Sequence, residues 1–164
     1  LEFRRVLFRS SVEKANVVAG LHPHVPVLGA DTCVELDGVV HGQPRDRDDA
    51  RRILLALSGR THNVHTAVSL VGPRGTVTFH DSARVTLQAL GPHILEWYLD
   101  TGEPFGKAGA YAVQGHGGVL VARVHGAMST VVGLPLRRTA DLLDRKSTRL
   151  NSSHVSESRM PSSA

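Results

Sequence analysis

The chain has 164 residues, of which 41% are hydrophobic and 21% charged, and a formal net charge of +4 at pH 7. Residues 11–143 carry twelve basic and twelve acidic side chains, so the positive excess lies entirely in residues 1–10 and 144–164. A neutral central region does not favour a basic surface that binds nucleic acid. Its length fits a single domain with its own core.

Cysteine content and hydropathy exclude two further classes of protein. Cys33 is the only cysteine, which rules out an intramolecular disulfide and fits a reducing compartment. No apolar run approaches the roughly 20 residues that span a bilayer. We therefore expect a cytoplasmic protein that binds neither nucleic acid nor membrane.

The two ends of the chain are related to each other at the level of DNA. Residues 144–154 can be back-translated into a sequence whose reverse complement encodes residues 1–10, and this DNA resembles a sequencing-library adapter. Unrelated protein ends should not be complementary in this way. We therefore interpret residues 1–10 and 144–164 as non-native adapter-like peptide, expected to pack poorly, and residues 11–143 as the domain.

The first half of the domain predicts a helix end, two strands and a second helix. Residues 12–20 have apolar side chains near helical spacing and end on glycine. Residues 25–36 predict a short strand that enters a Gly-Ala-Asp-Thr turn, followed by another short strand. Asp37-Gly38 predicts a hairpin turn. Residues 46–59 predict a helix, because acidic residues occupy its first turn and its apolar residues share one face.

The second half predicts a long hairpin, two helices and a glycine-rich loop. Residues 61–72 and 76–90 are rich in β-formers and are separated by Pro73-Arg74-Gly75. Residues 91–102 predict a helix with proline near its start. The later expected elements are a short strand at residues 111–114 inside a glycine-rich loop, further strand within 119–133 and a last helix at 134–143. This alternation predicts an α/β fold with a mixed sheet flanked by helices.

Asp31 is the first candidate for chemistry. It follows the apolar stretch Val27-Leu28-Gly29-Ala30. A carboxylate at the end of a buried strand can face a ligand cleft and act as a general base or metal ligand. The alternative is an aspartate that merely caps a turn.

The segment Gly106–Gly115 is the second candidate. Its small residues allow close approach of a ligand to the backbone, Lys107 offers a cation for phosphate, and Gln114 offers a donor and an acceptor for a base edge. It lacks the Gly-Lys-Ser/Thr ending of a P-loop. A glycine-rich turn without function is the alternative. His62 and His65 should point to opposite faces of a strand, so they do not predict a metal site.

Four segments in order and at matching spacing resemble the Maf family of nucleoside triphosphate pyrophosphatases. They are VLGADTCVELDGVVHGQP (27–44), DARRILLALSGRTHNVHTAV (49–68), GKAGAYAVQG (106–115) and VVGLPL (131–136). The resemblance implies a fold like that of the inosine triphosphate pyrophosphatases. It also implies hydrolysis of a nucleoside triphosphate to the monophosphate and pyrophosphate with a divalent metal, Mg²⁺ or Mn²⁺.

The resemblance assigns roles to particular residues. Asp31 matches the family's proposed proton acceptor and is also the expected metal ligand, while Thr32 and Gln114 match positions linked to base choice. Arg60 and Lys107 are expected to neutralise phosphate charge. The Ala-Asp-Thr and Gln-Gly sequences resemble the dTTP/UTP branch rather than the 7-methyl-GTP branch. The resemblance leaves a homodimer open.

The chain also departs from the family pattern. Gln43 stands where Gly-Lys-Pro usually has lysine, Gly106 where aspartate is common, and Thr130 where asparagine is frequent. Adapter-like sequence stands in place of the first strand and of the Ser-x-Ser-Pro-Arg-Arg phosphate loop. Two alternatives therefore remain beside a dTTP/UTP pyrophosphatase: a non-catalytic nucleotide-binding or septum-formation regulatory protein, and a pyrophosphatase for another, modified nucleotide.

Overall fold

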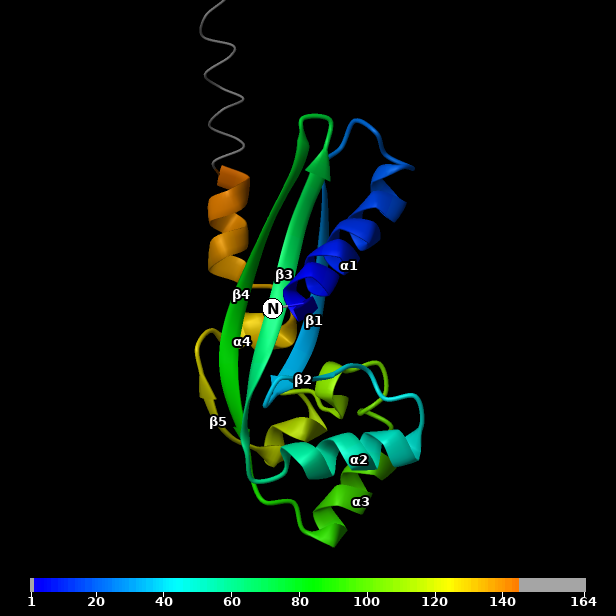
Figure 1. Ribbon diagram of the computed structural model, residues 1–164, viewed down its shortest axis with the longest axis vertical. Coiled ribbons are helices and arrows are strands. Elements are labelled where there is room, and N and C mark those ends of the chain that lie inside the picture. The colour runs from blue at the N-terminus through cyan, green and yellow to red at the C-terminus, as the bar shows by residue number, and fades with distance from the viewer. Residues whose placement is uncertain (1, 145–164) are drawn as a thin grey trace, which may run out of the picture.

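The computed structural model describes residues 2–144, which form one antiparallel sheet with helices on both faces (Figure 1). The expected tail at residues 144–164 lies outside the described residues except for Asp144. The strands are β1 (Val27–Leu36), β2 (Val39–His41), β3 (Thr61–Gly72), β4 (Gly75–Leu87) and β5 (Val121–His125). The helices are α1 (Glu2–Ala19), α2 (Arg47–Leu57), α3 (Pro92–Asp100) and α4 (Met128–Val132), with short 3₁₀ turns η1 (Ala108–Ala110) and η2 (His116–Leu120). No helix within residues 2–144 is both long and apolar enough to cross a membrane.

The sheet has the strand order β2-β1-β3-β4-β5. The α/β class with flanking helices is confirmed, but every pairing among the described residues is antiparallel rather than mixed. The two predicted hairpins account for two of these pairings, since short turns can join only antiparallel neighbours. Helix α2 connects β2 to β3, and these strands run parallel to each other but lie on opposite sides of β1.

Strand β1 is continuous from Val27 to Leu36, so the predicted Gly-Ala-Asp-Thr turn is wrong. Asp31 lies within the strand opposite Ala67, which removes its alternative role as a turn cap. Gly29 serves close packing instead: a Cβ there would lie 2.7 Å from the backbone nitrogen of Ala15 in α1. The glycine is needed because helix and strand touch.

Helix α1 contradicts the expectation that residues 1–10 pack poorly. Leu7, Ser11 and Ala15 recur every four residues and are buried against β1 and β3, and Leu7 is only 3% exposed. Phe3 and Phe8 place their rings beside His65 and His80. Apolar side chains at helical spacing drive this packing, because burying their surface against the sheet is favourable whatever the origin of the peptide.

The main hydrophobic core lies at the other end of the sheet, under α2 and α3 (Figure 1). Asp46 caps α2 by accepting a hydrogen bond from the backbone of Asp49 at 2.8 Å, and Ile53, Leu54 and Leu57 are buried as predicted. Tyr98 of α3 is completely buried in the same cluster. The loop that follows α3 leaves from this well-packed end of the molecule.

The segment after α3 contains less strand than predicted. Residues 111–114 form no strand; they are an irregular link between η1 and η2. Strand within 119–133 is limited to β5, and α4 follows it. The positive φ angles of Gly109, Gly115 and Gly126 interrupt extended backbone. Residues 136–144 are helical, in agreement with the predicted last helix.

Candidate active site

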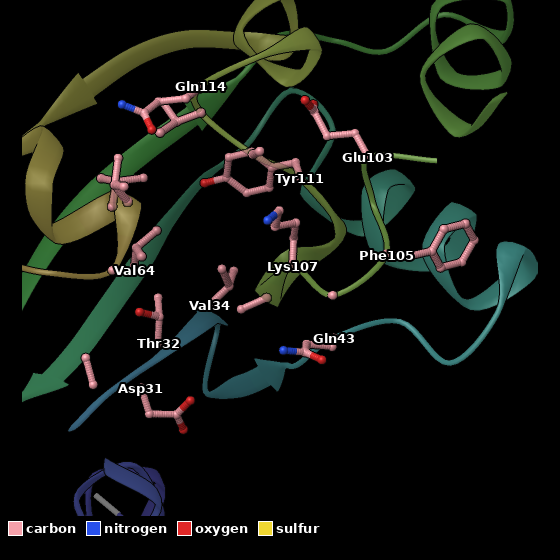
Figure 2. Close-up of a pocket in the computed structure, with 18 of the residues that line it drawn as sticks. Asp31, Thr32, Val34, Gln43, Val64, Glu103, Phe105, Lys107, Tyr111 and Gln114 are labelled. Atoms are coloured by element: carbon pink, nitrogen blue, oxygen red, sulfur yellow. The ribbon is translucent and has the colours of Figure 1, made fainter. Parts of the chain in front are cut away.

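A cavity of about 710 Å³ contains four of the five predicted site residues. Asp31 and Thr32 come from β1, whereas Lys107 and Gln114 come from the loop around η1 (Figure 2). More than 70 residues separate these pairs along the chain, so tertiary folding brings them together. In Figure 2, Asp31 and Gln43 lie towards one end, Gln114 and Glu103 towards the other, and Lys107 between them.

The cavity extends around an open edge of β1. Strand β2 pairs only with the last three residues of β1, so no strand within residues 2–144 covers that edge beside Asp31 and Thr32. Alternation along the strand sends Asp31 to the α1 face and Thr32 to the α4 face. Both side chains nevertheless line one cavity, because the edge between the two faces is exposed.

Asp31 forms an ion pair with Lys14 of α1. The Lys14 Nζ lies 2.5 Å from Asp31 Oδ1, and the Lys14 side chain is about half exposed while that of Asp31 is 25% exposed. The position of α1 sets this pair, since Ala15 packs directly on Gly29 two residues before Asp31. The pair places a cation and a carboxylate together at one end of the cavity.

Lys107 supplies a second cation to the cavity wall. Its backbone carbonyl accepts the Ala110 N–H, and the adjacent Gly109 N–H donates to Gly42, which holds the turn beside Gln43. Gly109 also allows η1 to pack on β1, because a Cβ there would lie 2.7 Å from a methyl group of Val34. The Lys107 ammonium has no carboxylate partner within the described part of the chain, so it is available to an anionic ligand.

Arg60 lies outside the cavity lining, unlike the other predicted site residues. Its guanidinium pairs with Asp37 at the β1–β2 turn. The backbone N–H of Arg60 donates to the carbonyl of Leu57 at the end of α2, just before β3 begins at Thr61. The structure therefore gives no support for Arg60 as a phosphate contact.

Gln114 is held between two anchored points. The Ala112 N–H donates to Tyr98 Oη at 3.1 Å on one side. On the other side the Gly117 and His116 N–H groups donate to the Glu103 carboxylate at 2.6 and 3.0 Å. This frame orders a segment that has no regular secondary structure.

Glu103 is a largely buried, ionised carboxylate whose side chain is 17% exposed. Burial acts to raise the pKa of Glu103, but hydrogen bonds from Gly117, Tyr98 and His116 outweigh it and hold the pKa below its ordinary value. Gly115 makes room for this group, because its φ of 89° is in the left-handed range and a Cβ there would overlap a Glu103 oxygen. The negative charge of Glu103 therefore serves to hold the loop at residues 116–117 in place.

Tyr111 closes one wall of the cavity and is tied to the core. Its hydroxyl lies 2.8 Å from His62 Nε2, and both side chains are buried. Burial lowers the pKa of His62 to about 4, so the imidazole is neutral at physiological pH. His62 meets Tyr111 whereas His65 meets Phe3 of α1, which confirms that the two histidines face opposite sides of the sheet.

The donor set suits a metal that arrives with a phosphorylated ligand. No group of three or more His, Cys, Asp or Glu side chains within residues 2–144 could hold a metal ion by itself. Asp31 is the lining carboxylate left for such a metal, since Glu103 accepts hydrogen bonds from the loop. Magnesium is commonly held by one or two carboxylates together with substrate phosphates and water. Asp31 could therefore bind a metal together with substrate phosphates and water, but the protein would not surround the metal with its own ligands.

Sequence reasoning missed Lys14, Glu103 and the buried threonines behind Thr32. A single lysine in a helix carries no local signal that its partner lies 17 residues later. Glu103 precedes the glycine-rich segment, but nothing in its spacing indicates a bond to Gly117. Only the packing of α1 on β1 and the folding back of the loop reveal these contacts.

Comparisons with known proteins place the chain in one protein family. Residues 4–146 match the family model described as Maf-like protein. The chain is 52% identical over 137 residues to the dTTP/UTP pyrophosphatase of Myxococcus xanthus (strain DK1622), covering 84% of this chain and 69% of that protein. It is 49% identical over 147 residues to the dTTP/UTP pyrophosphatase of Anaeromyxobacter sp. (strain Fw109-5), covering 87% and 70%. A Bordetella parapertussis protein of the same name is 50% identical over 121 residues, covering 74% and 58%.

Proposed function

The chain belongs to the Maf-like protein family, and on that premise we propose that it hydrolyses dTTP and UTP to the nucleoside monophosphate and pyrophosphate. The observation that carries the proposal is the convergence of Asp31, Lys107 and Gln114 on one cavity. Relatives about half identical to this chain bear the name of that activity. A cytoplasmic location accompanies this proposal, since the chain has one cysteine and the substrates are nucleotides.

The phosphates of the substrate bind at the Asp31 end of the cavity. Lys14 provides one cation there and Lys107 a second one further along the cavity, and charge neutralisation is the main requirement for phosphoryl-type chemistry. Lys14 already contacts Asp31 at 2.5 Å, so a phosphate oxygen bound by Lys14 would lie beside the carboxylate. Asp31 then accepts a proton from the water that attacks the α-phosphorus, and pyrophosphate leaves.

A divalent cation would be held by Asp31 and by the substrate phosphates. When bound, it supplies positive charge that offsets the charge developing on the phosphoryl oxygens. At the other end of the cavity, the framed Gln114 amide offers one donor and one acceptor to the base. Uracil and thymine present the same edge to such an amide, which supports dTTP and UTP as substrates.

Asp31→Asn tests this proposal. The asparagine keeps the size of the side chain but cannot accept the proton, so pyrophosphate release from UTP should fall by about a hundredfold to ten-thousandfold. Binding of UMP should persist, as measured by titration calorimetry. The control is Asp37→Asn, because Asp37 pairs with Arg60 outside the cavity.

If Asp31→Asn releases pyrophosphate from UTP as fast as the unaltered chain, Asp31 is not the general base. One observation favours a second function: Asp31 is already engaged by Lys14, and neutral Gln43 lines the same end of the cavity. Tight UTP binding by the unaltered chain without pyrophosphate release would identify a non-catalytic nucleotide-binding protein. Hydrolysis of modified nucleotides, without hydrolysis of dTTP or UTP, would identify a pyrophosphatase with a different substrate.

A further inference from the structure

One wall of the cavity is built from α4 and the glycine that follows it. Val131, Val132 and Gly133 line the cavity, and α4 itself is only five residues long. A helix this short is not stable by itself, and its N-cap residue, Ala127, makes no side-chain hydrogen bond. The position of this wall therefore depends on contacts between α4 and the sheet beneath it.

Beneath α4, three polar side chains form a row across the sheet. Thr32 of β1 lies opposite Thr66 of β3, and Thr66 lies opposite Asp81 of β4. Residues paired in this way point to the same face of the sheet, which here is the α4 face. Thr32 lines the cavity, Thr66 is completely buried, and the Asp81 side chain at the far end of the row is 30% exposed.

Thr130 of α4 is bonded to two members of this row. Its hydroxyl donates to Asp81 Oδ2 at 2.7 Å, and its backbone carbonyl accepts from Thr66 Oγ1 at 2.8 Å. A hydroxyl group has one proton, so Thr66, which donates to this carbonyl, accepts from Thr32 at 2.8 Å. Thr130 is completely buried, and a buried hydroxyl without an acceptor is costly. Loss of the Asp81 acceptor would therefore favour movement of α4 off the sheet.

Asp81 acts on α4 as a hydrogen-bond acceptor more than as a charge. Its other oxygen lies 3.7 Å from Arg138 Nη1, beyond hydrogen-bond distance, and the Arg138 side chain is about half exposed. Ion pairs of this kind contribute little to stability. Arg138 is also held by the ring of Phe79, whose centroid lies 4.7 Å from the guanidinium carbon, and by the backbone carbonyl of His80. The bond from Thr130 is therefore the contact through which Asp81 reaches the cavity wall.

We propose that Asp81 is a positioning residue for nucleotide binding: it anchors α4 through Thr130 and thereby fixes the cavity wall at Val132 and Gly133. This wall lies close to the opposite strand, since a Cβ at position 133 would lie 3.2 Å from Thr32 Oγ1. A small movement of α4 therefore changes the shape of the cavity. The inference rests on the proposed nucleotide site, but it concerns binding and not the chemical step, because Asp31 lies on β1.

The test compares Asp81→Leu with Asp81→Asn in the full chain. Leucine has a similar size but no acceptor, so KM for UTP and Kd for UMP should rise about tenfold, the effect of one net hydrogen bond, while kcat changes less than about threefold. Asparagine keeps an acceptor for Thr130, so both constants should stay within about twofold of those of the unaltered chain. Arg138→Met is the control, because it removes the other partner of Asp81 and should leave both constants unchanged.

A double-mutant cycle and hydrogen exchange identify the bond responsible. In a Thr130→Val background, Asp81→Leu should raise KM no further, because the donor is already absent. In the nucleotide-free chain, Asp81→Leu but not Asp81→Asn should speed amide exchange at residues 130–134. The inference is overturned if exchange there is unchanged, if the two Asp81 variants raise KM equally, or if Asp81→Leu has its full effect in both backgrounds.

Binding of UMP, measured by titration calorimetry, distinguishes this inference from the proposed function. If the unaltered chain releases no pyrophosphate from UTP but Asp81→Leu still weakens UMP binding, only the proposed function is contradicted. If UTP is hydrolysed and Asp81→Leu binds UMP as tightly as the unaltered chain, only the role of Asp81 is overturned. A chain without affinity for UMP would overturn that role as well, because no nucleotide site would then exist for α4 to shape.

Discussion

Gln43 contributes a neutral amide to the Asp31 end of the cavity, at a position where the family pattern usually has lysine. It lies beside the turn that carries Lys107, since Gly42 accepts the Gly109 N–H at 3.0 Å. Lys14 and Lys107 are the cations in the described lining of this cavity. A nucleoside triphosphate carries more charge than these two residues neutralise.

Gln43→Lys should therefore increase activity. A charge-assisted hydrogen bond to phosphate contributes roughly 1.5–3 kcal/mol, which corresponds to an increase of about tenfold to a hundredfold in kcat/KM for UTP. Steady-state assays of pyrophosphate release measure it. Gln43→Met, of similar length but uncharged, should give no increase. An equal response to both substitutions would mean that charge at position 43 does not matter.

At the scale of elements, the contact between α1 and β1 connects the fold to the site. The helix carries Lys14, and its approach to the strand depends on the missing side chain at Gly29. A Cβ at position 29 would meet Ala15 Cβ at 2.8 Å, closer than real side chains come. The ion pair at Asp31 therefore depends on how closely these two elements pack.

Gly29→Ala should lower the free energy of unfolding by about 1–3 kcal/mol, the usual cost of overpacking. Urea denaturation provides the measurement. Turnover of UTP should also fall, because α1 would move and carry Lys14 away from Asp31. Gly42→Ala is the matched control, since a Cβ there has no neighbour within 4 Å. The proposed packing role is wrong if both alanines have the same effect.

At the scale of the whole molecule, stability should depend on pH through the buried His62. Burial, with a smaller contribution from His41, lowers the pKa of His62 from 6.5 to about 4. Below pH 6.5 the unfolded chain binds a proton that the folded chain does not. Stability should therefore fall as the pH decreases from about 6.5 to about 4, by at most roughly 3 kcal/mol from this residue.

Chemical denaturation at about pH 7.5 and about pH 5 measures this dependence. His62→Gln should show a smaller loss of stability over that interval than the unaltered chain. His93→Gln, at an exposed position in α3, should keep the full loss. An identical pH dependence in all three proteins would mean that protonation of His62 is not coupled to unfolding.

Much of the fold could be predicted because its signals are local. The Asp37-Gly38 turn has positive φ at both residues, and the apolar face and acidic first turn of α2 specify a helix by themselves. The prediction of a turn within β1 was wrong. Gly29 was interpreted as part of a turn, whereas in the structure it allows β1 to pack closely against α1. The first half of α1, residues 2–10, was not predicted because these residues were interpreted as non-native peptide outside the domain.

The sequence by itself determined most of the helices and hairpins, the family resemblance, and the chemical types of Asp31, Lys107 and Gln114. Tertiary structure alone decided that these three residues share a cavity, that Arg60 turns away to Asp37, and that Lys14 reaches Asp31. It also decided the direction of the Thr32 hydroxyl through Thr66 and Thr130. Backbone preferences depend on neighbours within a few residues, whereas these contacts depend on packing between elements far apart in the chain.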